Sequence, residues 1–136
     1  MILTPHIGGS TEEAQAAIAE DVCGKLVTFI NNGSTSGAVN VPQVDLPGQE
    51  ASGADEETGE QSKRRHRVLH FHRNVPGMLK QINGAAAELG ANIAAQYLQT
   101  NAEVGYVVLD GDPTDGRRLT EALRRIDGTI RVRMLW

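Results

Sequence analysis

One short segment, residues 72–77, concentrates side chains that suit the binding of a small polar ligand. It lies where a predicted strand meets a predicted helix, and free backbone N–H groups at a helix start favour an anion such as a carboxylate. The amide of Asn74 both donates and accepts hydrogen bonds, which suits a zwitterionic amino acid. Pro76 is tolerated at the start of a helix, and Gly77 lets a ligand approach the backbone. The alternative interpretation is that Asn74 only caps the helix.

Other reactive side chains support weaker hypotheses. His70 and His72 are two residues apart on a predicted strand, so they share a face and resemble a metal-binding pair. No third ligand stands at a supporting spacing, and we therefore expect no metal. Cys23 falls in the middle of a predicted helix and is interpreted as a small core residue. No serine lies in a recognisable triad context.

The basic C-terminal half raises the alternative of RNA binding. Residues 63–136 hold twelve bases and seven acids, a net charge of +5. RNA-recognition domains stack bases on aromatic residues of their first and third strands, and those strands offer only Phe71 and Tyr106 here. The solvated charged surface is the better interpretation, and we expect no nucleic-acid partner.

The elements that position this segment follow from periodicity. Period-2 and period-3.6 patterns alternate in the order strand, helix, strand, strand, helix, strand. This order predicts a ferredoxin-like α/β sandwich, that is, an α+β fold with a four-stranded antiparallel sheet and two helices on one face. Its free face and edge strands favour self-association. The predicted elements are strand 66–72, helix 75–89, strands 92–99 and 104–110, helix 119–126 and strand 129–135.

A helix and an extended segment precede this fold. Ser10 and Glu13 have the spacing of a capping box, and an apolar stripe continues to residue 31. Asn32-Gly33 is a common helix stop, and two prolines forbid helix across most of residues 34–47. The apolar stripe has no obvious partner nearby in the sequence. We therefore predict that residues 1–47 either swap onto a partner chain or fray.

Composition divides the 136-residue chain, whose net charge is -4, into three parts. Residues 48–62 hold five acids, no base and no large apolar side chain, which is typical of a flexible linker. We predict an N-terminal segment at 1–47, a linker at 48–63 and a domain at 64–136. A single cysteine indicates a reducing compartment, which we take to be the cytoplasm. The sequence has neither a long apolar run nor a secretory signal, so we expect no membrane association.

Several motifs together resemble bacterial D-3-phosphoglycerate dehydrogenase. Ile-Leu-Thr-Pro-His-Ile-Gly-Gly-Ser-Thr at 2–11 and Ala-Val-Asn-Val-Pro at 38–42 resemble the end of its catalytic region. His-Phe-His-Arg-Asn-Val-Pro-Gly at 70–77 and Gly-Ala-Asn-Ile-Ala-Ala-Gln-Tyr-Leu-Gln-Thr at 90–100 resemble its C-terminal regulatory domain, which is of the ACT type. The resemblance covers nearly the whole chain except the linker.

The resemblance implies a serine-sensing regulatory domain. Members of the family oxidise 3-phosphoglycerate with NAD at the entry to serine synthesis, and their ACT domains pair edge to edge into dimers. By resemblance, L-serine or another small amino acid binds His72 and Asn74, with Asn92 contributed by the partner subunit. Val75, Pro76 and Gly77 complete the predicted effector site.

The resemblance also assigns parent-enzyme roles near the N-terminus. His6 occupies the place of the catalytic histidine, a residue type whose pKa suits acid–base chemistry. Gly8, Gly9 and Ser10 match the segment beside the nicotinamide of NAD. The phosphate-binding glycine loop and the other catalytic side chains have no counterpart in this sequence, so the chain alone is expected to be inactive and to hold no cofactor.

Two alternatives to serine sensing are a purely structural assembly module and a free-standing amino-acid-binding protein. Met1 falls within what would be the catalytic region, so we expect a truncated product or an expressed fragment. The glycine pair that serves the family as a hinge is replaced by the longer acidic linker. Control of a parent enzyme through such a tether is therefore in question.

Overall fold

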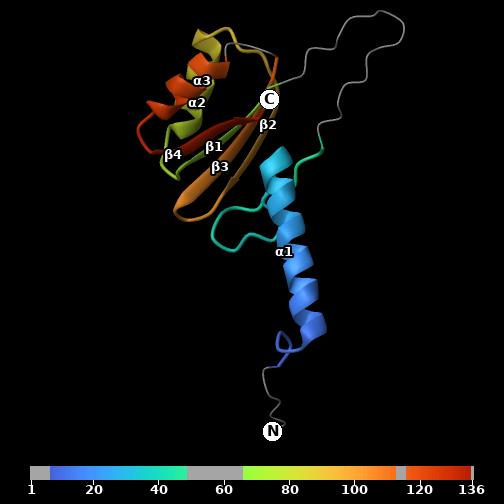
Figure 1. The fold of residues 1–136 in the computed structure, drawn as a ribbon. Coiled ribbons are helices and arrows are strands. Elements are labelled where there is room, and N and C mark those ends of the chain that lie inside the picture. Colours follow the sequence, from blue (N-terminus) through green and yellow to red (C-terminus); the bar gives the residue numbers. More distant parts are fainter. Residues whose placement is uncertain (1–6, 49–65, 113–115, 136) are drawn as a thin grey trace, which may run out of the picture.

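The computed structural model describes residues 7–48, 66–112 and 116–135. One long helix precedes a compact unit of four strands and two helices (Figure 1). No helix in these ranges is both long and apolar enough to cross a membrane. The elements are α1 (Glu12–Asn32), β1 (His66–Arg73), α2 (Met78–Glu88), β2 (Ile93–Thr100), β3 (Val104–Gly111), α3 (Gly116–Arg124) and β4 (Thr129–Leu135).

The four strands form one antiparallel sheet in the order β2-β3-β1-β4. The crossovers through α2 and α3 place β1 and β3 in the centre and leave β2 and β4 as edges. Asn101 builds the β2–β3 turn, where its Oδ1 accepts hydrogen bonds from the backbone N–H groups of Glu103 and Val104. This topology confirms the predicted ferredoxin-like fold.

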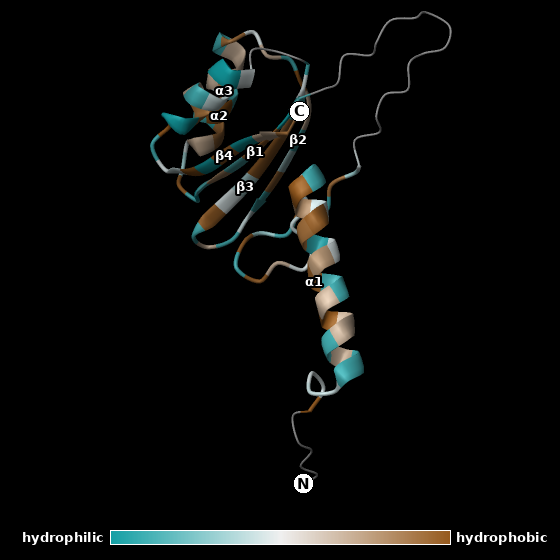
Figure 2. Ribbon diagram, viewed as in Figure 1, coloured by the Kyte–Doolittle hydropathy of each residue, from teal (hydrophilic) through white to brown (hydrophobic). Residues whose placement is uncertain are grey.

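The main core lies between the sheet and the two helices. Alternation along β1 directs Val68 and His70 toward the helices and Leu69 and Phe71 to the opposite face, as the period-2 pattern predicted. Figure 2 shows the hydrophobic colour along the central strand β3. The buried members of this core are Val68, Met78, Ile82, Ala86, Val107, Leu109, Leu119, Leu123 and Val132.

Residues 33–46 cover the opposite face of the sheet and form a second core. Val44 and Leu46 are buried there against Leu69, Tyr106 and Val108. The segment folds back on itself through hydrogen bonds between residues 34–35 and 44–46. The prediction that all of residues 1–47 frays or swaps is therefore wrong for 33–46. The need to cover this sheet face is met within the chain and does not require self-association.

Helix α1 reaches the sheet only at its C-terminal end and extends away from it (Figure 1). None of its side chains is buried, and an apolar stripe that includes Ile18, Val22 and Leu26 is about half exposed. The predicted capping residue Ser10 is off by one position, because Thr11 caps the helix and accepts a hydrogen bond from Ala14. Gly33 ends the helix in the left-handed conformation, as predicted. Cys23 is exposed, so its interpretation as a core residue is wrong.

Candidate ligand-binding site

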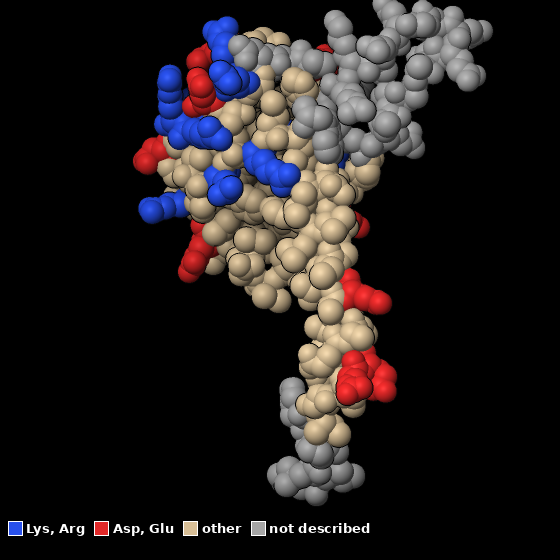
Figure 3. Space-filling model, viewed as in Figure 1, with Lys and Arg blue, Asp and Glu red and all other residues tan. Residues whose placement is uncertain are grey.

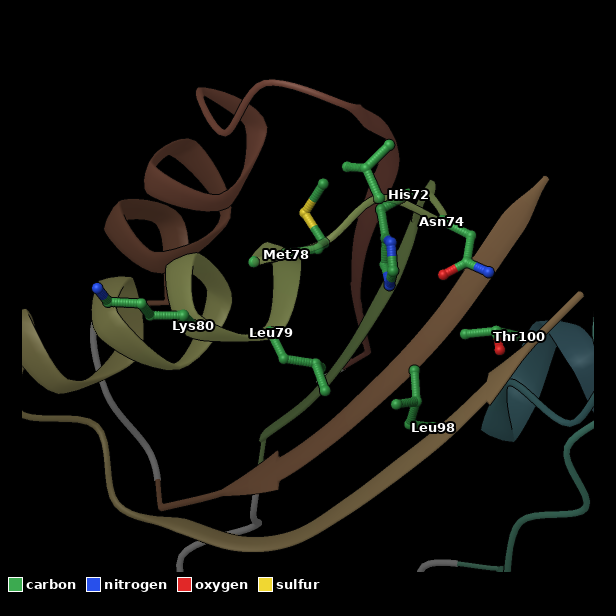
Figure 4. A pocket seen from close by; sticks show the side chains of 9 residues that line it. His72, Asn74, Met78, Leu79, Lys80, Leu98 and Thr100 are labelled. Atoms are coloured by element: carbon green, nitrogen blue, oxygen red, sulfur yellow. The ribbon is translucent and has the colours of Figure 1, made fainter. Parts of the chain in front are cut away.

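A pocket of about 180 Å³ opens between the start of α2 and the last residues of β2. Four of the six residues predicted to bind an effector line it, and Figure 4 shows His72 and Asn74 on one side with Leu98 and Thr100 on the other. Its walls combine apolar side chains with a few polar groups, as is usual for small-molecule sites. The lining residues are His72, Asn74, Val75, Gly77, Met78, Leu79, Lys80, Leu98 and Thr100.

His72 supplies an unpaired nitrogen to this pocket. Its Nδ1 lies 2.8 Å from the carbonyl oxygen of Arg73. Because a carbonyl only accepts, Nδ1 carries the proton, and in the neutral ring Nε2 is a free acceptor. The side chain is buried and Nε2 has no hydrogen-bond partner in the described structure. A buried polar atom without a partner is costly, which indicates that something else meets it.

Gly105 makes room for the His72 ring. The two residues are opposite each other in the β1–β3 ladder. A Cβ added at Gly105 would overlap the His72 ring atoms, so only glycine lets the ring lie flat across β3. This requirement was not recognised in the sequence, where Gly105 looks like an ordinary weak point in a strand.

His70 is the second histidine on this face, but it has a structural role. Its Nε2 lies 2.8 Å from Thr129 Oγ1, and that hydroxyl donates its own proton to the carbonyl of Leu123. His70 must therefore donate through Nε2, while its buried Nδ1 has no hydrogen-bond partner in the described structure. Burial, with a smaller contribution from His72, lowers the pKa of His70 to about 4. The two ring centroids are 5.5 Å apart.

Asn74 stands at the mouth of the pocket and does not cap α2. Its Nδ2 donates to the carbonyl of Asn101 at 2.8 Å, which ties it to the β2–β3 turn. Figure 4 shows the amide beside the His72 ring, with its oxygen turned toward the pocket. The capping alternative is therefore wrong, and Asn74 keeps an acceptor for a ligand.

The start of α2 has no side-chain cap. Gly77 occupies the N-cap position with φ +84°, and no side chain there accepts a hydrogen bond from the first turn. The helix therefore begins at Met78, three residues later than the predicted Val75. Val75, Pro76 and Gly77 form the turn between β1 and α2. The uncapped N–H groups of the first turn face an open position that suits a carboxylate.

Asn92 is not brought to this pocket within one chain. It precedes Ile93, which pairs with Gly111, whereas Thr100 at the other end of β2 pairs with Gly105. The Asn92 side chain donates instead to Asp112 Oδ2 at 3.0 Å. Asn92 is exposed at the far end of the same edge strand.

The residues assigned to NAD do not form a dinucleotide site in the described structure. Gly8, Gly9 and Ser10 lie in a turn just before α1, far along the chain from the pocket (Figure 1). A Cβ added at Gly8 would meet nothing within 4 Å, and one added at Gly9 would meet Ile18 of α1 at 3.6 Å. His6 lies outside the described residues. No step of hydride transfer can be derived from these groups.

Sequence reasoning missed five of the lining residues: Met78, Leu79 and Lys80 of α2, and Leu98 and Thr100 of β2. Leu98 and Thr100 are the two that lie far from residues 72–77 in the sequence. They alternate on the helix-facing side of β2, opposite Val107 and Gly105. Their period-2 spacing near the end of a strand was visible in the sequence. Their position close to His72 follows only from the strand order. Among the described residues, no group of three His, Cys, Asp or Glu side chains could hold a metal ion.

Charge is distributed unevenly around this site. Figure 3 shows basic side chains gathered over the helical layer and acidic ones along α1. The exposed arginines of α3 stand on the helical layer, away from the pocket lining. The pocket itself has Lys80 as its one charged lining residue, and Figure 4 shows this side chain pointing away from the cavity.

A family model identifies the class of the C-terminal domain. Residues 68–131 match the family model described as the AHAS small subunit-like ACT domain. The ACT domain from the GTP pyrophosphokinase of Chlorobium tepidum superposes with a TM-score of 0.48 and 20% identity, covering 53% of this chain and 97% of that one. The chain therefore contains an ACT domain.

The particular relationship extends over the whole chain. It is 47% identical over 136 residues to D-3-phosphoglycerate dehydrogenase of Haemophilus influenzae and 46% identical over 138 residues to that of Escherichia coli. D-3-phosphoglycerate dehydrogenase 1 of Saccharomyces cerevisiae is 38% identical over 139 residues. Its homologues are thus D-3-phosphoglycerate dehydrogenases, and it corresponds to their C-terminal region. The chain spans about 30% of the length of the bacterial relatives and 27% of the yeast relative.

Proposed function

We propose that this chain is the regulatory part of a D-3-phosphoglycerate dehydrogenase and that its ACT domain binds L-serine. The observation that carries the proposal is the buried Nε2 of His72, which faces the pocket without a partner. A small amino acid supplies what the pocket lacks, namely a hydrogen-bond donor for this nitrogen and an anion for the start of α2.

In this proposal, each group of serine has a partner in the pocket. The ammonium or the hydroxyl donates to His72 Nε2, and the Asn74 oxygen accepts from the other. The carboxylate lies at the uncapped first turn of α2. Apolar contacts with Val75, Met78 and Leu98 leave room only for a short side chain. A larger amino acid would have to displace these residues.

The edge strand beside the pocket favours a dimeric site. Leu98 and Thr100 belong to β2, whose outer edge has no neighbour in the described chain. If two copies of β2 paired antiparallel about their midpoint, residue 92 of one would lie beside residue 100 of the other. Asn92 of the partner subunit would then close the pocket. We therefore include a homodimer through β2 in the proposal.

Oxidation of 3-phosphoglycerate with NAD belongs to the proposed parent enzyme and not to this chain alone. The sequence has no counterpart of the phosphate-binding glycine loop, and the chain spans only part of its relatives. Addition of NAD and 3-phosphoglycerate to the isolated chain is expected to produce no NADH. A free-standing amino-acid-binding protein would share the same pocket and differ only in its partners.

Calorimetric titration of the chain with L-serine tests the proposal. We expect saturable heat, and we expect Asn74→Ala to weaken binding by roughly 1–3 kcal/mol if its amide bonds the ligand. Asn83→Ala is the matched control, since Asn83 is exposed on α2, does not line the pocket and accepts a hydrogen bond from Gln96. Absence of heat at millimolar serine, with the chain folded, would favour a purely structural assembly module.

A further inference from the structure

The outer face of the sheet holds a buried ion pair that the proposed effector site does not use. Arg67 Nε and Nη2 each lie 2.6 Å from one carboxylate oxygen of Asp110. Arg67 on β1 and Asp110 on β3 are direct neighbours in the ladder, and Arg67 is 1% exposed. Two parallel bonds of this kind fix the guanidinium plane as well as its position.

The remaining nitrogen of Arg67 reaches the N-terminal segment. Its Nη1 donates to the carbonyl of Asn32 at 3.0 Å and to that of Pro47 at 3.1 Å. These carbonyls mark the end of α1 and the end of the segment that covers the sheet. One guanidinium thus joins β1, β3 and both ends of residues 33–46. It also places a positive charge at the negative end of the α1 dipole.

Further side chains of β3 and β4 contact the same helix end. Tyr106 on β3 donates its hydroxyl to the carbonyl of Gly33 at 2.6 Å, and Arg133 on β4 donates to the carbonyl of Ile30 at 2.9 Å. Burial raises the pKa of Tyr106, against the opposing charges of Arg67 and Arg133, so the hydroxyl keeps its proton. Gly33 itself lies so close that an added Cβ would be 2.5 Å from Leu69 Cδ2.

We propose that Arg67, Asp110, Tyr106 and Arg133 form a clamp that fixes the direction of α1 relative to the ACT sheet. Because of this clamp, a rotation of the sheet carries α1 with it, whatever the length of the acidic segment between residues 48 and 65. Arg67 lies on the same strand as His72, five residues away on the opposite face. Transmission of effector binding to α1 through β1 rests on the proposed function.

The single cysteine of the chain allows a direct test. Cys23 is exposed on α1, and Glu121→Cys adds a second exposed site on α3. Spin labels at both positions report the distribution of α1–α3 distances by pulsed electron resonance, with labelled chains diluted in unlabelled ones to suppress contacts between copies. We expect a narrow distribution for the otherwise unchanged chain.

Removal of the clamp should broaden that distribution at least twofold. The double variant Arg67→Met with Asp110→Leu avoids leaving a buried charge unpaired. Arg131→Met is the matched control, because Arg131 is exposed on β4 and has no clamp contact. A folded double variant with the original narrow distribution would overturn the proposal.

A second pair of variants serves if the double variant fails to fold. Gly33→Ala and Gly37→Ala both place alanine at positive φ, but the first drives Cβ into Leu69, whereas the second meets only the flexible end of Lys25. Broadening is expected for Gly33→Ala alone, and equal distributions would contradict the clamp. Saturating L-serine should shift the distance distribution of the clamped chain and not that of Gly33→Ala. If serine binds in calorimetry but does not shift the distances of the clamped chain, β1 does not transmit effector binding to α1. If serine does not bind, the proposed effector is wrong. The clamp itself is then still tested by comparing Gly33→Ala with Gly37→Ala without serine.

Discussion

At the scale of single residues, two neighbouring histidines on one strand have opposite roles. His70 is satisfied at Nε2 by Thr129 and is held neutral by burial. His72 is satisfied at Nδ1 and presents Nε2 to a pocket. Each ring keeps one buried nitrogen without a partner in the described structure, and of the two residues only His72 lines the pocket.

The neutral state of His70 predicts acid sensitivity of the fold. Its pKa falls from 6.5 in the unfolded chain to about 4 in the folded one, so the unfolded state binds more protons between these values. Stability is therefore full above about pH 6.5 and is lost as the pH falls toward 4, by roughly 3 kcal/mol. Urea unfolding from pH 7 to 4 measures this, and His70→Gln, which can still donate to Thr129, should show a flatter profile. Identical slopes for both proteins would contradict the role of His70.

Gly105→Ala is expected to weaken both the fold and serine binding. The new Cβ would overlap the His72 ring, and overpacking of this kind costs about 1–3 kcal/mol. The ring must also turn away from the pocket, so the variant should lose affinity for serine in calorimetry. Unchanged affinity in a folded Gly105→Ala variant would mean that the position of His72 does not matter for the ligand.

At the scale of elements, α2 combines a functional start with an ordinary middle. Its first turn has a left-handed glycine and no side-chain cap, which is unfavourable for the helix but keeps the N–H groups accessible. The helix is instead stabilised by packing of Met78, Ile82 and Ala86 on the sheet. Helical stability here comes from tertiary burial, as it does in most short helices.

Gly84→Ala separates these two parts of α2. Gly84 is a mid-helix glycine whose added Cβ would meet nothing within 4 Å. Alanine removes the entropic cost of glycine in a helix and should stabilise the domain by about 0.5–1 kcal/mol. Thermal unfolding measures the gain, and serine affinity should not change. A destabilised Gly84→Ala variant would show that this face of α2 is covered in solution.

At the scale of the whole molecule, the two faces of the sheet contact different parts of the chain. The helical face carries the pocket, and the opposite face carries the clamp to α1. The free edges are β2 and β4, and only β2 borders the pocket. A homodimer that completes the site must therefore use β2.

Cysteine crosslinking tests whether β2 or β4 forms the interface of the proposed homodimer. Antiparallel pairing of two β2 strands brings the midpoint near Gln96 and Tyr97 next to its own copy. With Cys23→Ser as background, Gln96→Cys is expected to form a disulfide-linked dimer under mild oxidation, whereas Arg131→Cys on β4 is not. Crosslinking at 131 alone would move the interface to β4 and separate Asn92 from the pocket.

Periodicity along the chain was sufficient to predict the strand and helix order, the faces of β1 and the end of α1 at Gly33. These features depend on local rules, namely which side chains alternate and where positive φ is needed. The residue types of segment 72–77 also predicted a ligand site, and four of its residues line the pocket.

Only the tertiary structure decided which distant residues meet. The strand order brought Leu98 and Thr100 to His72 and placed Asn92 at the other end of β2. It also brought residues 33–46 onto the sheet through Arg67 and Asp110, which are 43 positions apart. Such contacts depend on sheet topology and on the burial of complementary charges, and neither property is written in any local pattern of the sequence.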